Sequence, residues 1–230
     1  MFEYLKDNIR KVEDQITVAA KKSGRKRKDI TLVAVAKTFG NDITRAAVEA
    51  GLTDIGESRI QDADPKIKAL GDICRWHMIG HLQTNKAAKA IDIFDLIQSV
   101  DTLKLAEMIN KKAENKMTRV KVLIEINSSG EMQKHGFIPE AAIDMIEQIN
   151  SMPTIEVCGL MTIGPNTRDK GEIRRAFSLT RSLFESGRKY VGEGFDILSM
   201  GMSSDFDIAI EEGSNMVRIG TAIFGKRKNR

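Results

Sequence analysis

The sequence predicts an α/β fold, a single-domain (β/α)8 barrel of the TIM type with an extra N-terminal helix. Short apolar runs alternate with amphipathic helical segments, which is the pattern of a parallel sheet covered by helices. Eight such units of about 25–30 residues suit a barrel, and the chain has 230 residues with no Pro-, Gly- or Ser-rich linker. The alternative is a doubly wound open sheet, which usually has fewer strands; no GxGxxG follows the first apolar run.

The chain opens with a helix, predicted over residues 4–22. Its apolar residues recur in steps of three and four, which places them on one helical face: Leu5, Ile9, Val12, Ile16 and Ala19. Ser23 and Gly24 end this helix. The basic run at residues 25–28 follows and is predicted to be a solvated loop.

Eight apolar runs are predicted as strands. The first is almost wholly apolar between residues 31 and 36, as expected of a strand buried on both faces. The predicted strands cover residues 32–38, 54–57, 75–79, 96–100, 120–127, 157–163, 197–201 and 216–219. Helices are predicted between them at residues 41–50, 61–70, 85–91, 102–115, 139–151, 171–186 and 205–212.

Composition and charge exclude several classes of protein. With 41% hydrophobic residues the chain can build a core, which excludes a wholly disordered protein. The net charge is +4, and residues 226–230 hold four cations, so the rest of the chain is neutral. No basic nucleic-acid face is therefore expected. The alternative is salt-sensitive nucleic-acid binding through this tail.

The cysteines, the histidines and the N-terminus add further exclusions. Cys74 and Cys158 lie far apart and form no CxxC, so neither a disulfide scaffold nor a thiolate zinc site is expected. His77, His81 and His135 could supply at most a sparse site, and no metal is predicted. The chain shows no long apolar run and no signal-like start. The expected location is the cytoplasm, without membrane contact.

Lys37 is the first candidate for chemistry, because barrel active sites lie where strands end. Val33, Val35 and Lys37 alternate at period two, so the valines are expected inside the barrel and Lys37 at its mouth. Desolvation in an apolar pocket lowers the pKa of a lysine amine. An unprotonated amine can attack a carbonyl and form a Schiff base. The alternative is a lysine that reaches from a strand end to water.

The ends of the seventh and eighth strands predict a phosphate site across the barrel mouth. A glycine-containing turn at residues 201–205 includes Ser203 and leads into a helix, and helix N-termini bind phosphate. After the eighth strand, Gly220 permits close backbone approach and Thr221 supplies a hydroxyl. Barrels commonly build phosphate sites from these two loops. The alternative is a simple helix N-cap at Ser203 or Ser204.

A Schiff-base lysine and a phosphate cradle together indicate a phosphorylated aldehyde, and pyridoxal 5'-phosphate (PLP) fits. Arg218 shares a face with Gly220 and can reach the mouth. An arginine beside the pyridine nitrogen would leave that nitrogen unprotonated, because arginine stays charged and only donates hydrogen bonds. The alternatives are an Arg218 paired with a carboxylate at the rim, and a class I aldolase that holds a sugar phosphate without a cofactor.

Several motifs carry a resemblance to a known family along essentially the whole chain. The most specific are WHMIGHLQTNK at residues 76–86 and SMGMS with VRIGTAIFG at residues 199–203 and 217–225. Weaker matches cover residues 34–38, 56–57, 99–101 and 159–162. With these motifs the chain resembles the pyridoxal phosphate homeostasis protein family, which is itself similar to the N-terminal barrel of alanine racemase.

The resemblance implies that Lys37 forms the Schiff base with PLP. It implies that Ser203, Gly220 and Thr221 contact the phosphate and that Arg218 faces the pyridine nitrogen. The implied role is to buffer or deliver PLP and to support amino- and keto-acid balance, without an established turnover. The second strand departs from the family pattern: Ser58 stands where the family usually has asparagine, and residues 61–62 read Gln-Asp instead of Gln-Glu. Cofactor contacts from this strand are therefore not carried over.

An amino-acid racemase is the main functional alternative. Racemisation needs a second base on the other face of the cofactor, typically a tyrosine, and neither Tyr4 nor Tyr190 lies at a predicted strand end. The expected domains are a PLP-binding barrel at residues 1–225 and a basic tail at residues 226–230. The expected partners are PLP and PLP-dependent apo-enzymes, and a monomer is expected.

Overall fold

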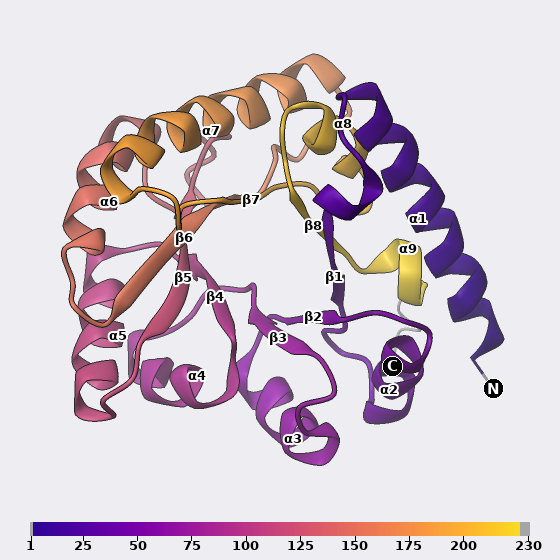
Figure 1. Cartoon of the computed structure of the whole chain (residues 1–230), viewed down its shortest axis with the longest axis horizontal. Helices are drawn as coiled ribbons and strands as arrows, with labels where there is room; N and C mark the ends of the chain where they lie inside the picture. Colours follow the sequence, from indigo (N-terminus) through magenta and orange to yellow (C-terminus); the bar gives the residue numbers. More distant parts are fainter. Residues whose placement is uncertain (1, 226–230) are drawn as a thin grey trace.

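A computed structural model describes residues 2–225, and its eight parallel strands close into a barrel in chain order (Figure 1). This confirms the predicted fold class. The last strand pairs with the first through Val33 and Arg218 and their neighbours. The strands are β1 (Thr31–Val35), β2 (Asp54–Glu57), β3 (Arg75–Met78), β4 (Leu96–Val100), β5 (Val120–Ile126), β6 (Ile155–Thr162), β7 (Ile197–Ser199) and β8 (Met216–Ile219).

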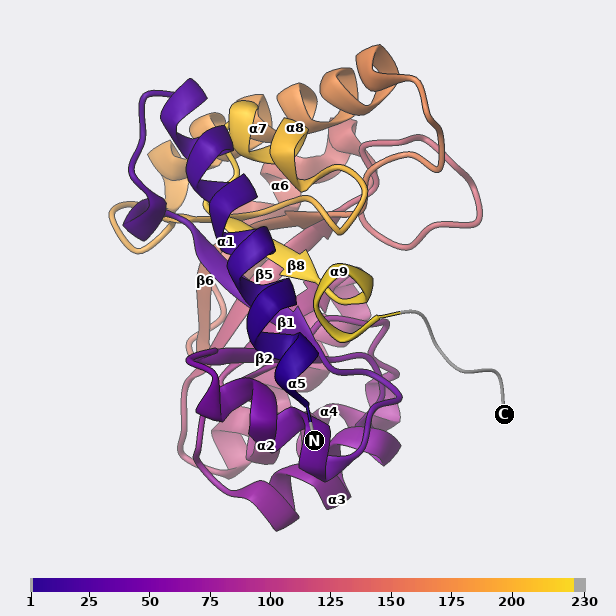
Figure 2. The same cartoon turned by 90° about the vertical axis from the view of Figure 1, so that its right-hand side faces the viewer.

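Helices surround the barrel: α1 (Glu3–Lys22), α2 (Asn41–Glu49), α3 (Ile60–Leu70), α4 (Ala87–Ile93), α5 (Leu103–Asn115), α6 (Ala142–Asn150), α7 (Lys170–Val191), α8 (Phe206–Glu211) and α9 (Thr221–Phe224). The N-terminal helix α1 runs across the outside of β1 and β8 and packs against α8 and α9 (Figure 2). Its buried face includes all five predicted residues. Within residues 2–225, no helix has the length and apolar character needed to cross a bilayer.

The predicted strands agree with the structure in number and order, and β2, β4 and β8 have the predicted bounds. The predicted end of the first strand at residue 38 is wrong. Ladder bonding continues only to Ala36, whose N–H donates to Gly56 over 3.0 Å, and the chain then turns. The short helix α9 was not predicted, because four residues are too few to show a helical period.

Side chains alternate between the barrel interior and the outer core, as strand geometry requires. On β8, Val217 and Ile219 join the outer core with the helices, while Met216 belongs to a small interior cluster. On β1, Val33 belongs to that same interior cluster and Ala34 to the outer core. Arg218, between Val217 and Ile219, therefore points into the barrel.

An internal hydrogen-bond chain crosses the barrel from β2 to β8. His77 Nε2 lies 2.9 Å from Asp54 Oδ1, and Gln98 Nε2 donates to His77 Nδ1 over 3.0 Å. Ser199 Oγ donates to Gln98 Oε1 over 2.7 Å, and Arg218 Nη1 donates to Ser199 Oγ over 2.6 Å. All five residues are buried. A buried polar group costs free energy when it lacks a hydrogen-bond partner. The internal hydrogen-bond chain supplies such partners, which explains how the barrel interior tolerates polar residues.

Replacing Asp54 by asparagine is expected to lower the free energy of unfolding by about 1.5–3 kcal/mol at pH 7, the usual range for hydrogen bonds to a charged group. Burial alone would raise the pKa of Asp54, but hydrogen bonds from His77, Arg75 and Thr53 outweigh it and hold the pKa well below its usual range. A carboxyl of this kind stabilises the fold above its unfolded pKa of about 4 and loses that contribution as the pH falls.

Urea unfolding of the wild type and Asp54→Asn at several pH values checks this expectation. The difference in stability should be full at pH 7 and should shrink below about pH 4. A difference that stays constant down to about pH 3 would show that the charge of Asp54 contributes nothing.

The basic run at residues 25–28 is only in part the solvated loop that the sequence predicted, because Lys26 and Lys28 are exposed but Arg25 and Arg27 are half-buried. Arg25 is half-buried and donates to the carbonyls of Gly213 and Ser214 over 3.2 and 2.9 Å. Arg27 pairs with the carboxylate of Glu13 on α1. The run thus ties the end of α1 to the start of β8. The second basic run, at residues 226–230, lies outside the described residues.

Candidate functional site

The candidate site lies at the end of the barrel where the strands finish, and Lys37 is exposed there, two residues after the end of β1. It occupies a turn that Phe39 N–H closes by donating to the Ala36 carbonyl over 3.1 Å. Lys37 is therefore at the mouth as predicted, but in a turn and not in the strand itself.

The turn that holds Lys37 is strained. Thr38 has φ = 71°, in the left-handed region that glycine or asparagine normally occupies. A β-branched residue in this conformation costs roughly 1–3 kcal/mol and persists only where its surroundings impose it. Such strained positions cluster at binding sites and active sites.

A buried ion pair supports the strand end just before Lys37. Lys66 on α3 pairs with the carboxylate of Glu57 on β2, and its Nζ also donates to the Ala36 carbonyl over 2.9 Å. Both residues are buried, and burial raises the pKa of Glu57 although the Lys66 ammonium opposes this. Lys66 was not among the residues predicted from the sequence. The available signal was Glu57 itself, because a charged residue in a buried strand needs a partner.

The three predicted phosphate residues come together at the ends of β7 and β8. Ser203 Oγ accepts from the Ala222 N–H over 3.3 Å, which places the 201–205 turn against the start of α9, where Thr221 is exposed. A β-carbon on Gly220 would lie 3.3 Å from both the Cβ and the carbonyl oxygen of Val35 on β1. The interpretation of Ser203 as an N-cap is wrong, because α8 begins after Asp205.

The loop after β7 that contains Ser203 and the loop after β8 that contains Gly220 and Thr221 are called the phosphate loops here. Their predicted position across the mouth from Lys37 is also wrong. In a closed barrel the eighth strand is the neighbour of the first, and β1 pairs directly with β8. The close approach of Gly220 to Val35 brings the phosphate loops to the same side of the mouth as the turn that holds Lys37.

Arg218 is held inside the barrel beneath these loops. Its Nη1 donates to the Ser199 carbonyl over 2.9 Å, and its Nη2 donates to the Thr162 carbonyl over 2.7 Å. Burial lowers the pKa of Arg218 to about 10, although the carboxylates of Glu125 and Asp205 oppose this, so it stays cationic at neutral pH. Arg218 thus donates hydrogen bonds to main-chain carbonyls and a hydroxyl. The alternative, in which it pairs with a carboxylate at the barrel rim, does not describe these contacts.

Glu125, which was not predicted from the sequence as a site residue, also lies in this interior layer. Burial and the charge of Asp101 together raise its pKa to about 7, although Arg218 acts in the opposite direction. A carboxyl with this pKa changes its charge near neutral pH. The sequence signal was again an acidic residue in a strand that is otherwise almost wholly apolar.

The remaining polar candidates separate in the structure. His77 lies inside the barrel in the internal hydrogen-bond chain, whereas His81 lies exposed at the mouth after β3. This agrees with the prediction that their spacing does not make them a pair. Tyr4 on α1 and Tyr190 on α7 are 44% and 50% exposed on the outer helices. Neither tyrosine lies at the end of a strand.

Comparison with known proteins shows similarity along nearly the whole chain. The family model described as alanine racemase, N-terminal domain, matches residues 7–228. The pyridoxal phosphate homeostasis protein of Aquifex aeolicus is 37% identical over 223 residues, which cover 96% of this chain and 98% of the relative.

Solved structures agree with this similarity. The crystal structure of an unknown protein from Bifidobacterium adolescentis matches with a TM-score of 0.91 and 38% identity, over 96% of this chain and 94% of that one. PipY of Synechococcus elongatus PCC7942, solved with PLP bound, matches with a TM-score of 0.82 and 29% identity, over 96% of this chain and all of PipY.

Proposed function

Because this chain belongs to the pyridoxal phosphate homeostasis protein family and to the alanine racemase N-terminal domain family, we propose that it binds PLP as a Schiff base on Lys37 and buffers or delivers it. In this role it supports intracellular PLP levels and the balance of amino and keto acids. The observation that carries the proposal is the convergence of Lys37 and the phosphate loops on one side of the mouth.

The phosphate loops fit the phosphate group of PLP. Ser203 and Thr221 offer hydroxyls, and Gly220 keeps the backbone of the β8 loop accessible because it carries no side chain. The bond from the Ala222 N–H to Ser203 holds the two loops together. Hydrogen bonds to a dianionic phosphate are the strong, charge-assisted kind.

Lys37 and Arg218 fit the other two functional groups of PLP. The amine of Lys37 can take the aldehyde, since its turn follows the strand that neighbours the phosphate loops. Arg218 is the residue we assign to the pyridine nitrogen. PLP supplies a reactive aldehyde and an electron-accepting ring. A ring nitrogen that faces a permanent hydrogen-bond donor stays unprotonated, and the ring then accepts electrons poorly.

This arrangement favours retention of PLP over turnover. The fixed bonds of Arg218 to Ser199 and Thr162 hold its guanidinium in one orientation. The racemase alternative requires a second base, and both tyrosines lie on the outer helices. We further propose that the PLP-binding domain occupies residues 1–225 and residues 226–230 form a basic tail, that the protein acts as a monomer in the cytoplasm, and that its recipients are PLP-dependent apo-enzymes.

The test is titration of the purified chain with PLP, followed by borohydride reduction and peptide mapping. A visible absorbance band should saturate at one PLP per chain, and reduction should leave the cofactor on the peptide that contains Lys37. Pyridoxal, which lacks the phosphate, should bind at least about tenfold more weakly because it loses charge-assisted hydrogen bonds.

Two results would contradict the proposal. One is a chain that stays colourless at saturating PLP, or whose label is scattered over many lysines. The other is conversion of L-alanine to D-alanine at rates typical of enzymes, of about 1 per second or faster, which would replace the buffering role by racemisation.

A further inference from the structure

A cluster of two histidines and one aspartate lies at the mouth on the β3–β5 side of the barrel. His81 follows β3, Asp101 directly follows β4, and His135 lies in the loop between β5 and α6. One nitrogen or oxygen atom from each lies within 4.8 Å of those of the other two. The phosphate loops follow β7 and β8, so the cluster uses none of the residues assigned to PLP.

Both imidazoles approach the same carboxylate oxygen. His81 Nδ1 lies 2.6 Å from Asp101 Oδ2, and His135 Nδ1 lies 3.5 Å from that oxygen. The two rings stack nearly parallel, with centroids 3.9 Å apart and 11° between their planes. Two ring nitrogens and a carboxylate therefore converge from three separate segments of the chain.

Asp101 contacts both histidines of the cluster, and the hydrogen-bonding capacity of its carboxylate is only partly used. Its side chain is only 2% exposed, and within residues 2–225 its Oδ1 atom has no hydrogen-bond partner. A buried carboxylate oxygen without a partner costs free energy. A cation in contact with both carboxylate oxygens of Asp101 would remove this cost.

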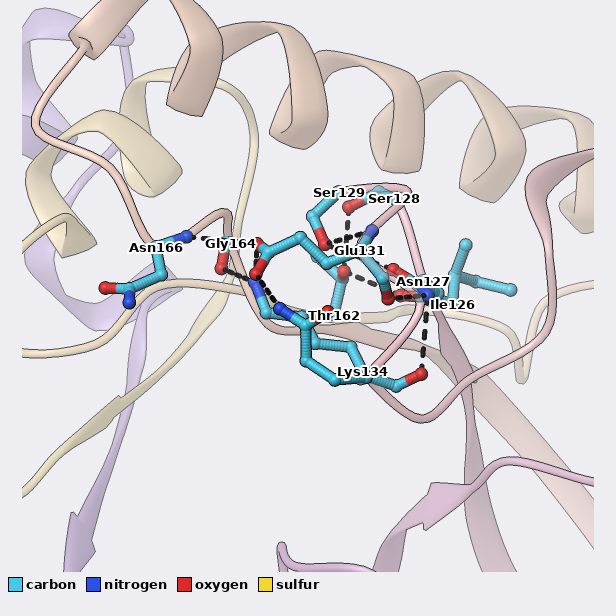
Figure 3. A network of polar contacts seen from close by, with 10 residues as sticks. Ile126, Asn127, Ser128, Ser129, Glu131, Lys134, Thr162, Gly164 and Asn166 are labelled. Carbon is cyan, nitrogen blue, oxygen red and sulfur yellow. Dashed lines mark hydrogen bonds and ion pairs between the residues drawn. The ribbon is translucent and has the colours of Figure 1, made fainter.

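The loop that carries His135 is held in place by its own polar contacts (Figure 3). Asn127 Nδ2 donates to the Glu131 carbonyl over 3.0 Å, and the carboxylate of Glu131 pairs with Lys134. Lys134 Nζ also donates to the Gly164 carbonyl over 2.7 Å. Residue 134 is thereby fixed to the segment after β6, directly before His135.

The chain on the other side of His135 is equally constrained. Phe137 N–H donates to the Glu125 carbonyl over 2.8 Å and so returns the loop to β5. Gly136 has φ = 112°, and a β-carbon there would lie 2.7 Å from the backbone nitrogen of Asn127. Only glycine fits that space. His135 is therefore positioned by backbone contacts and not by its exposed side chain.

We propose that His81, Asp101 and His135 form a binding site for one divalent transition-metal ion of the Zn²⁺ class. Two imidazole nitrogens and one carboxylate are a usual protein ligand set for such ions and leave a position open for water or a small ligand. The ion would take the place of the proton that His81 Nδ1 shares with Asp101. That proton moves to Nε2 or to solvent, because a ligating histidine is neutral.

Metal binding requires one adjustment of the side chains. Parallel rings cannot both direct an in-plane lone pair at one ion, so at least one imidazole must turn about its Cβ–Cγ bond. His81 and His135 side chains are 43% and 55% exposed, and exposed rings turn readily. The bound ion would then link the 127–137 loop to the ends of β3 and β4.

The test is a zinc titration of the chelator-treated, PLP-free full chain, by calorimetry with ZnCl₂ in a buffer free of amines. We expect one Zn²⁺ per chain, and Mg²⁺ should bind far more weakly because it prefers all-oxygen sites. Cobalt should give the intense visible bands of a low-coordinate site. The 127–137 loop should become more resistant to proteolysis when zinc is added.

His135→Ala is the decisive variant, because the side chain is exposed and its loss leaves the fold intact. It should weaken zinc binding at least about tenfold, as should Asp101→Asn, and both should lose the protection of the loop. Cys74→Ser is the matched control, since it removes another metal-binding side chain outside the cluster, and it should bind zinc as the wild type does.

Two results would overturn the proposal: a wild-type chain that takes up no zinc at micromolar concentration, or a His135→Ala variant that binds zinc as tightly as the wild type. The assay contains no PLP, so it is independent of the function proposed for Lys37. Repeating the titration on the PLP-loaded chain should again show one bound ion.

Discussion

Replacing Lys37 by alanine is expected to abolish the visible absorbance band of the PLP-loaded chain while the barrel stays folded. The variant lacks the only atom that can form the proposed Schiff base, so borohydride should fix no cofactor on the peptide containing residue 37. The fold should persist because Lys37 is exposed in the turn after β1. The phosphate loops are unchanged, so weak and reversible PLP binding should remain.

The measurement is an absorbance titration combined with circular dichroism, and Lys104→Ala is the matched control. Lys104 is also exposed and lies in the first turn of α5, at the same end of the barrel. The control should keep the full band. A Lys37→Ala chain that still forms the band would place the Schiff base on another lysine, and an unfolded Lys37→Ala chain would make Lys37 a structural residue.

Replacing Arg218 by leucine is expected to cost about 3–5 kcal/mol of stability, the range for removing one partner from a buried charged network. The change leaves the carbonyls of Ser199 and Thr162 without their donor. It also removes the cation that opposes the raised pKa values of Glu125 and Asp205, both of which are buried. Leucine fills much of the volume but satisfies none of these groups.

Urea unfolding at pH 7 checks this expectation, with Arg174→Ala as the control. Arg174 pairs with Glu211 and Glu212, but its side chain is 46% exposed, and pairs of this kind contribute about 1 kcal/mol or less. Arg218→Lys should recover only part of the loss, because lysine cannot reproduce the planar donor geometry. Equal stability of Arg218→Leu and the wild type would mean that the internal hydrogen-bond chain does not depend on Arg218.

The internal hydrogen-bond chain shows where prediction from sequence reaches its limit. Period-two alternation places Arg218 on the interior side of its strand, and this could be predicted from the residues alone. The partners of Arg218 could not, since Ser199 and Thr162 lie on two other strands, and Ser199 in turn bonds to Gln98 on a third. The contacts depend on strand stagger and barrel closure, which no local pattern encodes.

The contacts that support the turn of Lys37 likewise come from distant residues and could not be predicted from the sequence. Residues 34–38 identified the lysine as a candidate. Its turn, however, depends on Lys66, which reaches from α3 to the Ala36 carbonyl thirty residues earlier in the chain. Closure of the barrel also decided that the phosphate loops neighbour β1, whereas the sequence alone had predicted them across the mouth.

By itself, then, the sequence determined the alternation of strands and helices, the order of the strands and the residues expected at the mouth. These follow from hydrophobic periodicity, which records how each segment meets the core. Only the tertiary structure decided which mouth residues meet. His81, Asp101 and His135 are separated by 20 and 34 positions in the sequence, and they converge because parallel strands end at one rim. Contact between distant residues is a property of the closed barrel and not of any segment.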